Sequence, residues 1–136
     1  MTQLAVLLKN QISETERVQE IIEQLSQKHG WDTELQFNMN LALEEILTNV
    51  ISYGYEDKKE HEILLRFSIT AEDLTVEIED DGLAFNPLDQ PEPDLNKPLG
   101  ERQPGGLGIF LVRKVMDQVE YSRKNGKNIL TLRKKY

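Results

Sequence analysis

The sequence contains no cysteine, and this absence excludes several kinds of site. Disulfide bonds, thiolate metal centres and cysteine nucleophiles all require a thiol that the 136 residues do not supply. Histidine is scarce as well, because the chain has only His29 and His61, which stand apart from each other. A metal centre built on histidines and a Ser-His-Asp triad therefore have little support.

An excess of positive charge is also lacking. The chain has 16 Lys and Arg against 24 Asp and Glu, and its net charge of −8 argues against nonspecific nucleic-acid binding, which needs cations to displace counterions. The N-terminal run LAVLL is too short for a membrane span and follows no basic residue. We therefore expect a single domain, residues 1–136, in an intracellular, cytoplasmic protein that binds neither nucleic acid nor a membrane directly.

What is present is a hydrophobic pattern that predicts an α+β fold, with helices on one face of a single sheet. The first helix is predicted between a capping box of Ser13 with Glu16 and a stop at Gly30, and the second begins at Asp32. An Asn125-Gly126 turn joins the last two strands. The predicted strands are residues 3–9, 62–70, 74–80, 120–124 and 128–134, and the predicted helices are residues 14–29, 32–53 and 105–119.

The second helix contains an unusual polar pair. Asn49 is a poor helix former, and it lies one turn after Glu45 on the same helical face. Read alone, the pair is best explained as a solvated polar face. The functional alternative is a ligand site, because an Asn oxygen is a suitable ligand for Mg²⁺ and a neighbouring Glu can deprotonate an attacking hydroxyl.

A second motif, IEDDGLAF, spans residues 78–85. Asp80 falls on the apolar face of its strand, where a carboxylate is costly unless it finds hydrogen-bond donors. Gly82 then allows the chain to turn sharply. An ordinary Asp-Gly turn is the simpler explanation of this motif alone. The alternative is a buried carboxylate that accepts a hydrogen bond from the amino group of a ligand such as adenine.

A third motif, PGGLG at residues 104–108, opens a helix after a stretch that contains all five prolines, residues 86–104. A long loop without periodicity is usually functional or disordered. Glycines at a helix start suit a phosphate, although the signal is weak alone, and neither a P-loop nor a Rossmann fingerprint is present. Taken together, the three motifs and the loop supply a metal ligand, a base reader, a lid and a phosphate cradle, which is a complete nucleotide site.

These motifs resemble those of the GHKL ATPase superfamily, whose Bergerat ATP-binding fold also occurs in gyrase, MutL and histidine kinases. EILTN resembles its N box, DDGLA its G1 box and GGLG its G2 box. The phrases EEILTNVISYGY and GGLGIFLVRKVMDQVEY are most similar to the bacterial anti-sigma factor serine/threonine kinases. The resemblance covers essentially the whole chain. It implies a two-layer sandwich, with three helices on one face of a mixed, mostly antiparallel sheet.

The resemblance also implies ATP and Mg²⁺ as cofactors. Asn49 would coordinate Mg²⁺, Glu45 would act as the general base, and Asp80 would accept from the adenine amino group. Ala84 stands where many members have a second glycine. With residues 86–104 as the lid, the other nucleotide-binding positions would be Gly82, Ala84, Arg102, Gly105, Gly106, Leu107 and Gly108.

Members of this subgroup phosphorylate a serine of a STAS-domain anti-anti-sigma protein, and many also bind a sigma factor. The resemblance therefore implies a partner-switching regulator of transcription. It also suggests that the chain forms a homodimer. Arg17 is a candidate partner contact, although a solvated charge explains it better from sequence alone. The alternative function is a nucleotide-gated binding module without kinase activity. A histidine-kinase catalytic fragment is a third reading, but no phosphoacceptor helix pair precedes this domain.

Overall fold

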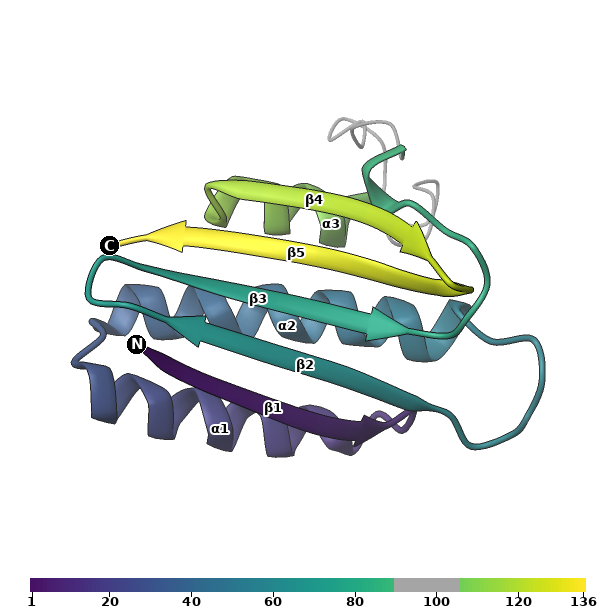
Figure 1. Ribbon diagram of the computed structural model, residues 1–136, viewed down its shortest axis with the longest axis horizontal. Helices are drawn as coiled ribbons and strands as arrows, with labels where there is room; N and C mark the ends of the chain where they lie inside the picture. Colours follow the sequence, from purple (N-terminus) through teal and green to yellow (C-terminus); the bar gives the residue numbers. More distant parts are fainter. Residues whose placement is uncertain (90–105) are drawn as a thin grey trace.

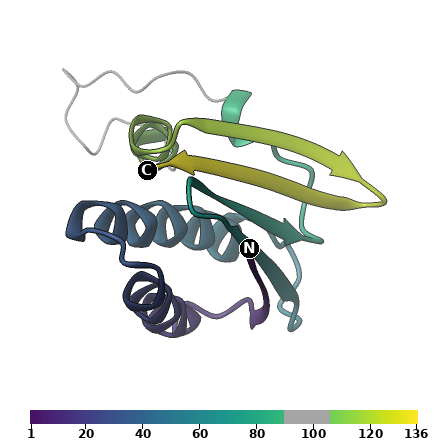
Figure 2. The ribbon, with the colours of Figure 1, turned by 60° about the vertical axis from the view of Figure 1, so that its left-hand side comes forward.

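A computed structural model describes residues 1–89 and 106–136, which form two layers. A five-stranded sheet makes one layer, and helices cover one of its faces (Figure 1). Figure 2 shows the two layers from the side, with the helices together against the sheet. The elements are β1 (Thr2–Lys9), α1 (Glu14–His29), α2 (Thr33–Tyr53), β2 (Glu62–Ile69), β3 (Asp73–Asp80), the 3₁₀ turn η1 (Pro87–Asp89), α3 (Gly106–Val115), β4 (Gln118–Lys124) and β5 (Lys127–Lys135).

The strand order is β1-β2-β3-β5-β4, and every neighbouring pair is antiparallel. The predicted α+β class and two-layer architecture are confirmed, but the described sheet is antiparallel throughout and not mixed. The reason lies in the final hairpin. Strand β4 runs parallel to β3, but β5 returns between them and separates the two (Figure 1). The predicted turn has Asn125 and Gly126 at φ 54° and 75°, as a tight hairpin with the twist of its strands requires.

The junction between α1 and α2 is as predicted. Gly30 adopts a left-handed conformation, φ 66°, and its N–H donates to the Ser26 carbonyl, so it ends α1. Asp32 is the N-cap of α2, because its side chain accepts a 2.8 Å hydrogen bond from the Leu35 N–H. These two residues fix where the second helix starts, and therefore which of its faces meets the sheet.

One capping contact and one helix end were predicted wrongly. Helix α1 begins at Glu14 as predicted, but Ser13 is already helical and its side chain makes no capping hydrogen bond, so the capping box with Glu16 does not form. The Glu14 carboxylate accepts a hydrogen bond from the Lys9 N–H at the end of β1. Helix α3 ends at Val115 and not at residue 119, because the Asp117 N–H already pairs with the backbone of β5. No helix in the described ranges is both long and apolar enough to cross a membrane.

The hydrophobic core lies between the helices and the inner face of the sheet. Alternate residues of β2 and β3 point into it, including the fully buried Leu65, Phe67 and Val76. Asp80 is the last residue of this inward row in β3, and only 6% of its surface is exposed. The alternation that builds the core therefore also carries a carboxylate to the end of it.

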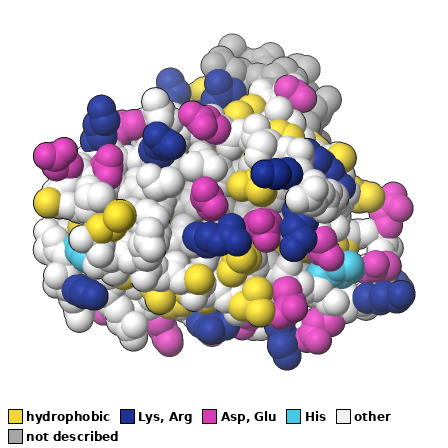
Figure 3. Space-filling model, viewed as in Figure 1, with side chains coloured by type: hydrophobic (Ala, Val, Ile, Leu, Met, Phe, Trp, Pro, Cys, Tyr) yellow, Lys and Arg dark blue, Asp and Glu magenta, His cyan; other side chains and the backbone are white. Residues whose placement is uncertain are grey.

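The outer face of the sheet carries side chains of both charges, interspersed across the strands (Figure 3). Arg66 lies 3.4 Å from Glu77 and 3.7 Å from Glu79, and Lys127 also lies 3.7 Å from Glu79. Such exposed pairs stabilise a fold by roughly 0–1 kcal/mol each. This face is a mixed polar surface, and the apolar side chains of the sheet are concentrated on the other side.

Candidate functional site

A pocket of about 340 Å³ opens at the end of the sheet where β3 finishes and β5 begins. Its lining is mostly apolar with a few polar groups, which is typical of a site for a small molecule. A larger hollow of about 700 Å³ lies at the opposite end of the sheet, and none of the predicted site residues lines it. The smaller pocket is lined by Ile46, Asn49, Val50, Tyr53, Gly54, Ile78, Asp80, Leu83, Ala84, Phe85, Pro87, Ile109, Tyr121, Asn128 and Leu130.

Asp80 is the acidic side chain in the lining of this pocket. Its Oδ1 accepts hydrogen bonds from the Gly82 N–H at 2.9 Å and from the Asn128 side-chain amide at 3.0 Å, and no described residue donates to Oδ2. Burial raises the pKa of Asp80 above its ordinary value, and the hydrogen bonds from Asn128 and Gly82 oppose that rise. The carboxylate is therefore held by one oxygen while the other is available to a ligand.

Gly82 lies where the chain leaves β3 and crosses the end of α2. The next N–H, that of Leu83, donates a 2.7 Å hydrogen bond to the Gly54 carbonyl. A Cβ on Gly82 would stand only 2.4 Å from that same carbonyl oxygen. The protein's own backbone thus requires a glycine here, whereas the role of Gly82 beside a ligand stays a prediction.

Glu45 and Asn49 project from the same side of α2. Asn49 lines the pocket and is partly buried, so it is not the fully solvated side chain that the helix alone would favour. Glu45 is partly buried too, whereas its neighbour Glu44 is exposed. Burial raises the pKa of Glu45, and the charge of Glu44 adds to the rise. The two acids are therefore different in environment, as their positions on the helix predict.

The start of α3 meets Glu45 directly. A Cβ on Gly108 would stand 2.5 Å from Glu45 Oε2, so the carboxylate packs against the helix at a position that has no side chain. Gly106 and Leu107 begin α3, and their role beside a phosphate stays a prediction. Glu45 itself does not line the pocket, but its neighbour on α2, Ile46, and Ile109 of α3 do, so this contact lies beside the pocket.

The remaining predicted positions are placed only in part. Ala84 lines the pocket and is exposed. Arg102, Gly105 and most of the predicted lid lie outside the described residues. Of the lid, the described beginning includes η1, and Pro87 from this turn lines the pocket.

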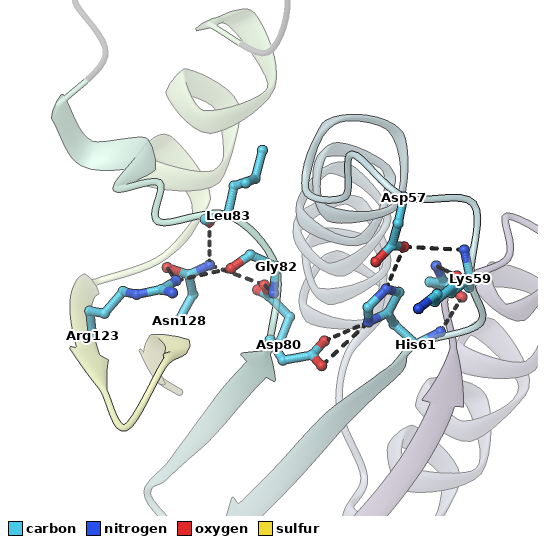
Figure 4. Close-up of polar contacts among 10 residues, drawn as sticks. Asp57, Lys59, His61, Asp80, Gly82, Leu83, Arg123 and Asn128 are labelled. Atoms are coloured by element: carbon cyan, nitrogen blue, oxygen red, sulfur yellow. Dashed lines mark hydrogen bonds and ion pairs between the residues drawn. The ribbon is translucent and has the colours of Figure 1, made fainter.

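The sequence reasoning missed one buried residue, Asn128. It lies in β5 directly opposite Asp80 and is 7% exposed. The signal was present, because Asn128 shares the inward face of its strand with Leu130 and Leu132, just as Asp80 shares an apolar face. Figure 4 shows Asn128 between Arg123 and the turn after Asp80.

A second missed group lies beside the turn after β3. His61 Nε2 is 2.7 Å from Asp57 (Figure 4). The other ring nitrogen, Nδ1, is 3.1 Å from Asp81. Tyr55 stacks on the imidazole with ring centroids 4.3 Å apart. The hydrogen bond with Asp57 is the largest cause that raises the pKa of His61, and Asp81 adds to it. These contacts tie the loop after α2 to the chain next to Asp80.

Comparison with known families agrees with this geometry. A family model described as "Histidine kinase-like ATPase domain" matches residues 8–134. The serine/threonine-protein kinase BtrW of Bordetella bronchiseptica is 32% identical over 111 residues, which cover 82% of this chain and 78% of that protein. The serine-protein kinase RsbW of Bacillus subtilis is 29% identical over 94 residues, 65% of this chain and 58% of RsbW. An anti-sigma F factor of Clostridium perfringens is 27% identical over 99 residues, 72% of this chain and 71% of that protein.

Two solved structures share the fold. The crystal structure of the RsbU and RsbW domains of a Mycobacterium tuberculosis protein matches with a TM-score of 0.71 at 13% identity, over 98% of this chain and 32% of that one. The histidine kinase AdeS of Acinetobacter baumannii matches with a TM-score of 0.52 at 16% identity, over 99% of this chain and 68% of that one. At these identities the likeness concerns the arrangement of helices and strands.

Proposed function

The chain belongs to the histidine kinase-like ATPase family and, within it, to the anti-sigma factor kinase subgroup, and we propose that it transfers a phosphoryl group from Mg-ATP to a serine or threonine of a STAS-like antagonist protein. One observation carries the proposal. An apolar pocket holds a buried carboxylate, Asp80, and borders a helix that presents Asn49 and Glu45 one turn apart. The proposed adenine-binding carboxylate and the proposed Mg²⁺ ligand thus line one cavity, and Glu45 lies one helical turn before that ligand.

At the base end, the proposed role of Asp80 is to accept a hydrogen bond from the adenine amino group. Its Oδ1 is already engaged, so Oδ2 is the atom for this contact. The apolar lining, which includes Ile78 and Leu130, suits the faces of a purine ring. A hydrogen bond to a charged group contributes about 1.5–3 kcal/mol, enough to select a base that carries an amino group.

At the phosphate end, the residues present fit Mg²⁺. Among the described residues, no cluster of three acidic or histidine ligands exists, so a metal here would need oxygens from the nucleotide as well. That is the usual arrangement for Mg²⁺, which takes few protein ligands together with phosphate oxygens and water. Asn49 would hold the ion through its amide oxygen. When bound, Mg²⁺ would neutralise charge on the phosphate oxygens.

Glu45 is the proposed general base. Its partly buried carboxylate has a raised pKa, which improves its ability to take the proton of a substrate hydroxyl. The backbone N–H groups at the start of α3, from Gly106 to Gly108, are the proposed phosphate donors, because a helix N-terminus favours negative charge. Arg102, in the lid of residues 86–104, and Gly105, which directly follows the lid, are proposed to assist.

The proposed partners are a STAS-domain antagonist as the substrate and a sigma factor as the protein released or held by the switch. Arg17, the candidate contact on α1, is not free of the fold: its Nη1 donates to the Leu7 carbonyl at 3.0 Å and lies 3.5 Å from Glu14. About half of its side chain, 52%, is exposed. Arg17 therefore has a structural contact and an exposed surface that a partner can reach.

The test is phosphoryl transfer from [γ-³²P]ATP, with Mg²⁺, to the STAS-domain protein that co-purifies with the chain. We expect labelled phosphoserine or phosphothreonine on that protein. If the chain binds both ATP and the partner but transfers no label, the kinase proposal fails, and the nucleotide-gated binding module replaces it.

A further inference from the structure

Among the described residues, Asn128 is the side chain that donates a hydrogen bond to Asp80, the proposed adenine-binding carboxylate. It faces Asp80 across the β3–β5 pair, and its Nδ2 donates to Asp80 Oδ1 at 3.0 Å. The same nitrogen donates to the Leu83 carbonyl at 2.8 Å, in the turn that follows β3. One amide thus holds both the carboxylate and the chain that leaves the strand (Figure 4).

The oxygen of the Asn128 amide is also fully used. It accepts from the Tyr121 hydroxyl, from Arg123 Nη1 at 3.0 Å and from the Phe85 N–H at 3.4 Å. Because three donors face the oxygen and two acceptors face the nitrogen, only this orientation of the amide satisfies its neighbours. A side-chain amide has two N–H donors and one acceptor oxygen, so none of its hydrogen-bonding capacity remains for a ligand.

We propose that Asn128 is the positioning residue of the nucleotide site, and that it sets the selectivity for a purine with a 6-amino group by fixing Asp80. Without the donor at Oδ1, the carboxylate can rotate, and Oδ2 no longer has one direction into the pocket. Asn128 thus acts on the ligand through Asp80 and not by contact. The inference rests on the proposed function, since it presumes that Asp80 reads adenine.

A further contact supports a rigid arrangement. Arg123 Nη1 donates to the Gly82 carbonyl at 3.0 Å as well as to Asn128. The turn after β3 is therefore held by Asn128 on one side and by Arg123 on the other, while Gly82 donates its own N–H to Asp80. A network in which each member is satisfied fixes side-chain orientation more strongly than a single hydrogen bond does.

The test compares ATP with purine riboside triphosphate, which carries hydrogen in place of the 6-amino group. Dissociation constants for both are measured by titration calorimetry on the unchanged chain and on Asn128→Leu, a substitution of similar size without polar atoms. The unchanged chain should bind ATP at least about tenfold tighter than the analogue, from the strength of a hydrogen bond to a charged acceptor. In Asn128→Leu this preference should fall to about threefold or less, because Asp80 no longer holds one orientation toward the 6-amino group.

A merely structural role of Asn128 gives a different result. Asn128→Leu would then weaken both nucleotides by the same factor and keep the full preference, and this outcome overturns the inference while it leaves the proposed function intact. If the unchanged chain does not prefer ATP over the analogue, the assignment of Asp80 as base reader fails, and the inference fails with it.

Two further variants keep the test decisive. Asn128→Ala, which also removes the amide that donates to Asp80 Oδ1, replaces Asn128→Leu if that variant does not fold, and the same loss of preference is expected. Thr131→Val is the matched control, because it is a change of similar shape on the outward face of the same strand. It should keep both dissociation constants, and loss of preference there would attribute the effect to the strand and not to Asn128.

Discussion

The two ends of the proposed site hold their carboxylates in different environments. At the end formed by β3 and β5, Asp80 is almost fully buried and receives hydrogen bonds from Gly82 and Asn128. At the end formed by α2 and α3, Glu45 is only partly buried, and no described residue donates a hydrogen bond to its carboxylate. The same contrast holds for the amides, because Asn128 is saturated whereas no described residue bonds to the side chain of Asn49.

The different environments suit different proposed roles, base recognition for Asp80 and proton transfer for Glu45. A carboxylate fixed by donors presents one oxygen in one direction, which suits the reading of a base. A carboxylate without donors keeps its lone pairs, and burial raises the pKa of Glu45, which suits proton acceptance. In the proposed function, the fold therefore completes the base end by itself, while Asn49 and Glu45 at the phosphate end would be engaged by the nucleotide and Mg²⁺.

The largest expected effect comes from removing the unbonded carboxylate. Glu45→Gln should lower the rate of phosphoryl transfer by about 10²–10⁴-fold, the usual contribution of a general base, because the amide cannot take a proton. ATP affinity should change little, since Asp80 and the apolar lining are untouched. Single-turnover transfer to the STAS-domain partner measures the rate, and calorimetry measures the affinity.

The neighbouring acid is the matched control for this variant. Glu44→Gln removes the same charge from an exposed position and should keep the rate at neutral pH. Because Glu44 contributes to the raised pKa of Glu45, its removal should move the acidic limb of the rate profile to lower pH. Equal rate losses in the two variants would contradict the assignment of Glu45 as the base.

A change in the wall behind Glu45 should have the next largest effect. The new Cβ in Gly108→Ala would stand 2.5 Å from Oε2, so the carboxylate must move. A displacement of about 1 Å can cost up to about 100-fold in rate, and we expect a loss of about tenfold to 100-fold in transfer. Glu45→Asp in the same background shortens the side chain and should recover part of the rate. A Gly108→Ala variant with unchanged transfer would show that the carboxylate has another productive position.

At the base end, the expected effect of a substitution is mainly a loss of folding stability. Gly82→Ala places a Cβ 2.4 Å from the Gly54 carbonyl oxygen, where the backbone cannot give way easily. We expect a loss of about 1–3 kcal/mol in the free energy of unfolding, as for other overpacked sites, together with weaker ATP binding. Urea unfolding measures the first. Ala84→Gly, two residues on, removes a methyl group from an exposed position and should alter unfolding far less.

These contrasts mark how far the sequence could predict the site. The periodicity of β3 placed Asp80 on the apolar face, and the helical spacing distinguished Glu45 from Glu44. The same alternation places Asn128 on the buried face of its strand. Its position opposite Asp80, however, depends on the pairing of β3 with β5, which are far apart in the sequence. Pairing of that kind follows from tertiary packing and not from local pattern.

Close approaches were beyond prediction for a related reason. The sequence predicts that the backbone at Gly82 and Gly108 approaches a ligand. The structure shows groups of the protein itself next to these glycines, the Gly54 carbonyl at Gly82 and the Glu45 carboxylate at Gly108. Likewise, the hydrogen bond from the Lys9 N–H at the end of β1 to the Glu14 carboxylate is a contact that no helical pattern contains. Local rules supplied the elements, while the contacts between elements required the fold.

The smallest expected effect concerns pH and the His61 group at the base end. The pKa of His61 is raised from 6.5 by Asp57 and Asp81, so its contribution to stability is complete below about pH 6.5 and is lost as the pH rises through the higher folded value. The pKa of Asp57 is lowered, so its contribution is lost only when the pH falls through that lowered value in the acid range.

We expect the melting temperature of the unchanged chain to decline modestly as the pH rises above neutrality, and His61→Gln to flatten this part of the profile. ATP affinity should follow the same direction weakly, because Asp81 adjoins the reader. An identical pH profile in both proteins would show that the loop after α2 does not support the base end through this histidine.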